Sequence, residues 1–156
     1  MTGQVILDAN LIVLLVVGMA SPDYIEGHKR LTDYKISDYQ LLTDLLSEFG
    51  QPPLLVTPHI LTEASNLLNT GGEPRRTTIM KQFAAFVSHV EEMHVPAATA
   101  IQRNEFLRLG LSDTALLDPD LKEAVLLTAD GPLYSAACDL GRRAESFKHH
   151  RENQRR

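Results

Sequence analysis

Four acidic residues stand at positions from which a folded chain can bring carboxylates together. Asp8 and Asp130 each directly follow a short apolar stretch that is typical of a buried strand. Asp113 stands at a predicted helix start, and Glu63 lies within the first two turns of another predicted helix. Ligands of open α/β sheets bind outside the carboxyl ends of the strands. We therefore expect these four carboxylates to lie at one edge of a sheet.

Carboxylates that cluster in this way repel one another, and their pKa values rise unless a cation lies among them. A site built only from oxygen ligands selects a hard ion such as Mg²⁺ or Mn²⁺, and the His residues and the single Cys show no spacing that suggests zinc. One or two such ions can activate a bound water and neutralise the charge that builds on a phosphodiester. The predicted chemistry is therefore metal-assisted hydrolysis.

Each of these acids also has an ordinary structural explanation. Asp8 and Asp113 can cap the helices that begin beside them. Asp130 can be a turn residue, and Glu63 can be a solvated surface acid. An acid that ends a buried strand needs a partner, however, and this favours the metal role for Asp8.

The carboxylates can meet only if strands and helices alternate along the chain. Apolar, β-rich stretches predict strands over residues 4–7, 54–56, 125–127 and 144–147. The stretches between them predict helices, which we expect over residues 10–17, 37–49, 57–70, 74–93, 97–107, 112–117 and 131–140. This alternation predicts an α/β fold with a mostly parallel sheet and right-handed crossovers.

The composition is that of an ordinary globular protein in a reducing compartment. The chain has 156 residues, of which 44% are hydrophobic and 22% charged, and it is long enough to bury a core. The single Cys138 excludes an intrachain disulfide, and its apolar neighbours place it in the predicted core. The first apolar run has no basic segment before it and is too short to span a bilayer. We therefore expect a cytoplasmic protein with no membrane partner.

Charge is distributed unevenly along the chain. The net charge is −5, but residues 142–156 carry +4, which leaves −9 on the residues before them. We expect one domain over residues 1–148 and a basic, flexible tail over residues 149–156. A body this acidic does not bind nucleic acid through bulk charge, so any such contact needs a bridging cation or a local basic patch. One short basic stretch, residues 28–30, lies in a predicted loop, where solvated side chains are the ordinary expectation.

Four stretches of the chain, at residues 5–10, 57–63, 109–113 and 125–130, together resemble the PIN-domain ribonucleases of the prokaryotic type. This family includes the VapC-like toxins, and the four stretches stand in the family's order. The resemblance implies a three-layer α/β/α fold, with the acidic residues around Mg²⁺ or Mn²⁺ and two polar residues in support. These residues are Asp8, Glu63, Asp113 and Asp130, supported by Asn10 and Thr128. The two polar residues fit local capping equally well.

The function expected from this resemblance is that of a metal-dependent endoribonuclease, as the toxin of a toxin–antitoxin pair. Asp8, Asp113 and Asp130 are the expected metal ligands. Glu63 would complete the site or orient the attacking water. The expected partners are an RNA substrate, an antitoxin protein and a second copy of the chain.

Two alternatives remain open. A non-catalytic PIN-like module that binds RNA or a protein partner would keep the fold. The acidic body and the helix-breaking pair 118–119, which follows Asp113 closely, favour it. The pair 118–119 and the longer stretch 18–51 are the two departures from compact VapC-like toxins. A phosphatase of the haloacid dehalogenase type also begins with a strand and an Asp, but its chemistry needs a second acid where this chain has Asn10.

Overall fold

The strands form one run of parallel neighbours in the computed structural model, which describes residues 3–154. They are β1 (Val5–Leu7), β2 (Leu55–Val56), β3 (Glu91–Glu92), β4 (Val125–Thr128) and β5 (Ala144–Ser146). β1, β4 and β5 make one sheet in the order β1-β4-β5, and β2 pairs with β3. An isolated bridge between Val5 and Leu54 places β2 beside β1. Every pairing in the described residues is parallel, which confirms the predicted α/β fold with its mostly parallel sheet.

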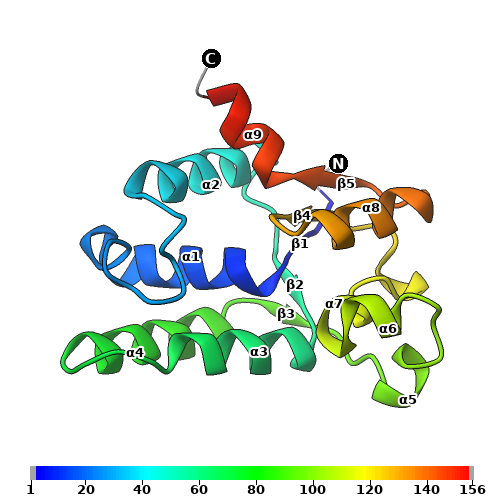
Figure 1. The fold of residues 1–156 in the computed structure, drawn as a ribbon, viewed down its shortest axis with the longest axis horizontal. Coiled ribbons are helices and arrows are strands. Elements are labelled where there is room, and N and C mark those ends of the chain that lie inside the picture. Colours follow the sequence, from blue (N-terminus) through cyan, green and yellow to red (C-terminus); the bar gives the residue numbers. More distant parts are fainter. Residues whose placement is uncertain (1–2, 155–156) are drawn as a thin grey trace.

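Helices lie on both sides of these strands (Figure 1). They are α1 (Ala9–Ala20), α2 (Ile36–Glu48), α3 (Pro58–Leu68), α4 (Arg75–Val87), α5 (Ala97–Ala100), α6 (Phe106–Leu109), α7 (Leu111–Ala115), α8 (Gly131–Asp139) and α9 (Phe147–Gln154), with the 3₁₀ turns η1 (Pro22–Tyr24) and η2 (Pro119–Leu121). In the view of Figure 1, α1 to α4 lie to the left of the strands and α5 to α8 to the right. The arrangement is compatible with three layers, helices on either side of a sheet.

The core is built around α1. This helix is apolar except for Asn10, and it is buried without a break from Leu11 to Gly18. A helix that is apolar all round must be enclosed, and α1 packs against α2, α3 and α4. Even so, no helix within residues 3–154 is both long and apolar enough to span a bilayer.

Several helix boundaries differ from the predicted ones. α2 begins one residue early, because the Asp38 carboxylate accepts a hydrogen bond from the backbone N–H of Lys35 (2.8 Å) and closes the first turn there. α4 ends at Val87, because the following residues leave the helix and pair with β2. The helix predicted over residues 97–107 is two short helices, α5 and α6.

The predicted core position of Cys138 is wrong, because the thiol belongs to an exposed residue. α8 buries a face made of Leu133, Ala136 and Ala137 against the sheet. Cys138 lies outside this face, since one residue further along a helix than Ala137 is a turn of about 100°. An apolar neighbourhood in the sequence therefore did not define the buried face.

The C-terminal residues also differ from the predicted tail, as far as the structure describes them. Residues 149–154 belong to α9 rather than to an irregular segment, and the last two residues of the predicted tail lie outside the described part. Arg151 donates hydrogen bonds to both carboxylate oxygens of Asp38 (3.0 and 3.3 Å) and to the backbone carbonyl of Asp33 (2.8 Å). Asp38 is buried, so this ion pair fixes α9 against the start of α2.

Replacing Gly18 by Ala should destabilise the fold. A Cβ at this position would lie only 2.1–2.5 Å from ring carbons of Tyr39, so α1 and α2 would have to move apart. Overpacking of this kind costs about 1–3 kcal/mol, and urea denaturation would measure the loss. Gly131→Ala is the matched control, because a Cβ there meets nothing within 4 Å. Equal stability of the two variants would show that the contact between α1 and α2 is not tight.

Candidate metal centre

Asp8 is the most buried of the four acids, with 3% of its surface exposed. β1 delivers it to the carboxyl edge of the sheet, where it caps α1 by accepting a hydrogen bond from the Leu11 N–H at Oδ1 (2.9 Å). Its Oδ2 accepts bonds from the Thr128 hydroxyl and from the backbone N–H of Ala129 (2.9 Å for the latter). The carboxylate therefore connects the ends of β1 and β4 with the start of α1.

The pKa of Asp8 is raised despite these three donors. Burial is the largest cause, because it removes the water that solvates the charged form. The bonds from Thr128, Leu11 and Ala129 lower the pKa in part, and the nearby charge of Asp130 raises it. A cation beside Asp8 would reverse the balance by favouring the charged form.

Asp130 lies at the end of β4 and reaches the same edge. Its Oδ1 accepts a hydrogen bond from the Leu133 N–H (2.8 Å) and so caps α8. Its own backbone N–H donates to the hydroxyl oxygen of Thr128 (2.9 Å). Because Thr128 also donates to Asp8, one buried hydroxyl sets the spacing between the two acids.

Asp113 is the third residue of α7, a helix that begins directly after the positive-φ residue Gly110 (φ 81°). Its side chain is half-buried, and its pKa is raised to about 7. Burial is the first cause, and the charges of Asp8, Asp130 and Glu63 add to it in that order. Without a cation, the neutral form of this carboxyl is therefore favoured over a wider pH range than for an ordinary Asp.

Glu63 lies on α3 and is the most exposed of the four. Its pKa is raised by partial loss of water and by the charges of Asp8 and Asp130, while the Ser112 hydroxyl lowers it. That hydroxyl also lies 3.5 Å from the backbone carbonyl oxygen of His59, a long contact beside a carboxylate acceptor. Ser112, the residue before Asp113, therefore places a hydroxyl beside Glu63.

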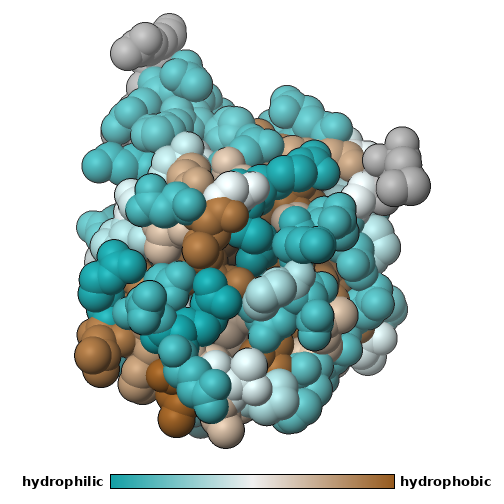
Figure 2. Space-filling view, turned by 90° about the vertical axis from the view of Figure 1, so that its right-hand side faces the viewer, coloured by the Kyte–Doolittle hydropathy of each residue, from teal (hydrophilic) through white to brown (hydrophobic). Residues whose placement is uncertain are grey.

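The four predicted acids repel one another across a single region at the carboxyl edge of the sheet. The charge of Asp130 raises the pKa of Asp8, of Glu63 and of Asp113, and the charge of Asp8 raises the pKa of Glu63 and of Asp113. Among residues 3–154, however, no three acidic, His or Cys side chains lie close enough together to hold an ion as they stand. The donor set fits a hard cation by its chemistry, and binding would require the side chains to draw together. Figure 2 views the side of the molecule on which α7 and α8 lie, and most of it is hydrophilic.

Thr128 and Asn10, the two polar residues predicted to support the acids, differ in burial. Thr128 is fully buried between Asp8 and Asp130, as its hydrogen bonds require. Asn10 lies in the first turn of α1 and is exposed, although its neighbours along the helix are buried. Of the two, only Thr128 therefore makes contacts with the acids that would support the site.

Tyr34 is a residue of this region that sequence reasoning missed. It lies in the loop before α2, and its pKa is raised to about 12 by burial first and then by the charge of Asp8. Its ring packs on Phe147 (6.4 Å between centroids), and the Arg151 guanidinium lies 5.0 Å from its centre. The phenol stays protonated near Asp8, so it can act as a hydrogen-bond donor there. No local pattern marks this loop, because α9 holds the tyrosine in place.

Comparisons with protein-family models, with characterised proteins and with solved structures each give no match for this chain. The assignment of function therefore rests on the residues and their geometry.

Asp113→Asn should make the metal-free protein more stable at neutral pH. The folded-state pKa of about 7 lies above the ordinary pKa of 3.8 for an Asp side chain, so the unfolded chain loses this proton first as the pH rises. Stability is then lost between about pH 4 and pH 7, and an amide removes that loss. Thermal unfolding from pH 4 to 8 should show a gap between variant and wild type that widens with pH. A gap that stays constant would mean that Asp113 is not destabilised by its neighbours.

Thr128→Val should destabilise the protein by about 1–3 kcal/mol, the cost of leaving buried polar groups without partners. The change keeps the shape of the side chain but removes the donor to Asp8 and the acceptor for the Asp130 N–H. Thr128→Ser keeps the hydroxyl and is the control. Urea denaturation would measure both variants, and a valine variant as stable as the serine variant would contradict the bridging role.

Proposed function

We propose that the protein is a metal-dependent endoribonuclease of the PIN-domain type, which hydrolyses RNA phosphodiester bonds with Mg²⁺ or Mn²⁺. The observation that supports it is the mutual repulsion of four acids at the carboxyl edge of a parallel sheet. Burial first, and then this repulsion, raises the pKa of Asp113 to about 7. A protein gains nothing in stability from such an arrangement, and clustered, perturbed carboxylates are typical of functional sites.

The proposed role of each acid follows from its burial and its contacts. Asp8, Asp113 and Asp130 are the proposed ligands of the ion, and they present only oxygen atoms. Glu63 is the most exposed of the four, so it is suited to orient an attacking water. When bound, the ion would supply a more acidic water and a positive charge beside the phosphate. Thr128 would position Asp8 through its hydrogen bond. The Tyr34 phenol would donate a hydrogen bond in the region of Asp8.

The wider setting is part of the same proposal. By its resemblance to VapC-like toxins, the protein would act as the toxin of a toxin–antitoxin pair, with an antitoxin protein and a second copy of the chain as partners. The exposed thiol of its single cysteine fits a reducing, cytoplasmic location.

The proposal predicts that purified protein cleaves single-stranded RNA with Mg²⁺ or Mn²⁺ and that EDTA stops the cleavage. Asp8→Asn should lower the rate by about 100-fold or more, because it removes a charge on which the ion depends. Asp139→Asn is the control, since this exposed acid ends α8 away from the other carboxylates. Cleavage by Asp8→Asn at the wild-type rate would overturn the proposal.

A non-catalytic RNA- or protein-binding module is the second candidate. The observation that favours it is the lack of a ready-made group of three ligands among residues 3–154. Calorimetric titration with Mn²⁺ separates the two: heat of binding that Asp8→Asn abolishes supports the nuclease. RNA binding with no heat from Mn²⁺ and no cleavage supports the module.

A further inference from the structure

The segment that joins α7 to β4 contains a helix break that the candidate metal centre does not explain. Asp118 and Pro119 interrupt the helical path just after α7, and the 3₁₀ turn η2 follows before β4 begins. This segment, yellow in Figure 1, leads from Asp113 to Asp130. The separation of these two acids therefore depends on what holds the segment in place.

The side chain of Arg142 spans the break. Its Nη1 donates a hydrogen bond to the backbone carbonyl of Leu116 (3.0 Å), and its Nη2 donates to that of Leu121 (3.1 Å). Leu116 lies at the C-terminal end of α7, where carbonyl groups lack partners within the helix and a cation is favourable. Because the guanidinium presents its N–H groups as a planar fork, one side chain ties together the two sides of the break.

The end of α8 fixes the backbone from which Arg142 reaches across. Gly141 has φ +73°, a left-handed conformation that ends the helix. The backbone N–H of Arg142 donates to the carbonyl of Ala137 (2.9 Å), as in a Schellman motif. The carbonyl of the next residue, Arg143, accepts a hydrogen bond from the N–H of Leu126 in β4 (2.9 Å). Arg142 is therefore held between the end of α8 and the sheet.

The burial of Arg142 is costly. The residue is only 9% exposed, and it forms no ion pair with a carboxylate within residues 3–154. Burial first, and then the charge of Arg103, lowers the pKa of Arg142, while the charge of Asp118 raises it. Its Nε is buried without a hydrogen-bond partner in the described part of the chain. An apolar side chain of similar size would avoid this cost, but it would leave both carbonyls unheld.

α7 depends on such contacts for its position. It has five residues, too few for a helix that is stable by itself. The backbone N–H of Leu116 donates to the carbonyl of Asp113 (3.1 Å), so Asp113 is one hydrogen bond away from the residue that Arg142 holds. A shift of the segment at Leu116 would therefore move Asp113 as well.

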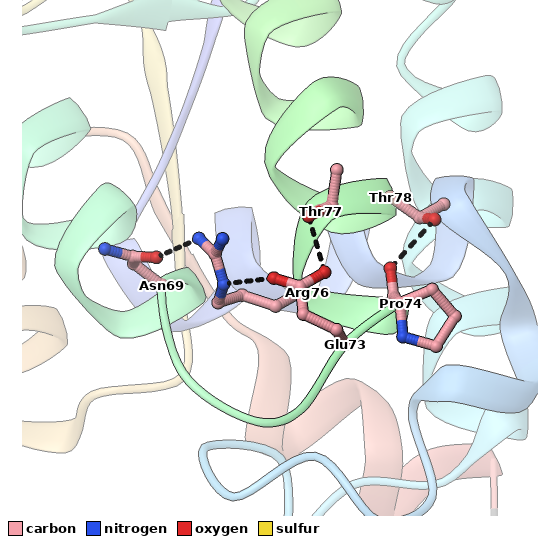
Figure 3. Close-up of polar contacts among 6 residues, drawn as sticks. All are labelled: Asn69, Glu73, Pro74, Arg76, Thr77 and Thr78. Atoms are coloured by element: carbon pink, nitrogen blue, oxygen red, sulfur yellow. Dashed lines mark hydrogen bonds and ion pairs between the residues drawn. The ribbon is translucent and has the colours of Figure 1, made fainter.

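Arg76 also joins two parts of the chain, but in the ordinary setting of the surface. Its Nε donates to Glu73 Oε1 (2.7 Å) and its Nη1 donates to Asn69 Oδ1 (2.8 Å), in the loop between α3 and α4 (Figure 3). This guanidinium is partly exposed and meets a carboxylate. Arg142 bridges in the same way, but it is buried and binds backbone carbonyls beside α7. Arg76 is therefore a matched control for the loss of a bridging arginine.

We propose that Arg142 is a positioning residue of the candidate metal centre. It closes the break after α7 and thereby keeps Asp113 at the acidic edge of the sheet, from which it can join Asp8 and Asp130 on a cation. The metal role of Asp113 rests on the proposed function, whereas its placement by Arg142 does not. Partners that orient metal ligands matter for binding, and losing one typically costs about 10–100-fold in metal affinity.

NMR spectra of the metal-free protein and calorimetric titration with Mn²⁺ test the proposal on Arg142→Met and Arg142→Lys. Methionine removes both hydrogen bonds, and lysine keeps the charge but lacks the fork. In the methionine variant we expect the backbone amide signals of Ser112 and Asp113 to shift, while that of Asp8 stays in place. Its Mn²⁺ affinity should fall about tenfold or more, and the lysine variant should lie between it and wild type in both measurements.

Two control variants separate positioning from a general loss of stability. Arg76→Met removes a bridging guanidinium from the loop between α3 and α4, and Gly18→Ala strains the contact between α1 and α2. Neither change touches α7 or the segment after it. Both variants should bind Mn²⁺ within about twofold of wild type, as expected for distant sites that act independently.

An unshifted Asp113 signal or an unchanged Mn²⁺ affinity in folded Arg142→Met would overturn the proposal. An equal loss of affinity in Gly18→Ala would also overturn it, because the effect would then follow from stability alone. If the methionine variant does not fold, Arg142→Lys decides by the same two measurements. Wild-type protein that binds no Mn²⁺ and cleaves no RNA would contradict the proposed function instead, and the amide signals would still decide whether Arg142 places Asp113.

Discussion

A single buried carboxylate joins the main parts of this structure. Asp8 receives hydrogen bonds from the start of α1 and from the end of β4, so the central strand, its neighbour and the core helix all meet at one side chain. Its burial is costly, and three donors offset that cost only in part, as the raised pKa indicates. The geometry of the other acids depends on this junction, because Thr128 sets the distance from Asp8 to Asp130.

The parts of the fold that could be predicted are those governed by the apolar pattern. β1, α1 and β4 are apolar runs bounded by polar residues, and the acids beyond them reach one edge because parallel strands end on the same side. Exposure within a helix is harder to predict, as Cys138 demonstrates. The ends of α4 and the division between α5 and α6 depend on partners distant in sequence, such as the pairing of β3 with β2.

The candidate site was predictable to a similar extent. The four acids stand at strand ends and helix starts, where residue type and position together are informative. Tyr34 could not be found in this way, because its place beside Asp8 is set by Phe147 and Arg151 from the other end of the chain. The prediction of solvated side chains over residues 28–30 is wrong for His28, which is only 8% exposed. The loop before α4 forms part of its surroundings, and the local basic pattern does not reveal that contact.

The attachment of α9 has a consequence for the order in which the molecule is completed. During synthesis, the loop that carries Tyr34 emerges long before Arg151. Arg151 forms an ion pair with Asp38, and its guanidinium lies over the Tyr34 ring. Contacts that span most of the chain close late, because their loop-closure entropy must first be overcome. The nascent chain therefore gains the wall of the acidic site around Tyr34 only when its last helix docks. A C-terminal truncation that removes α9 would leave that wall unfinished and would also take the fully buried Phe147 out of the core.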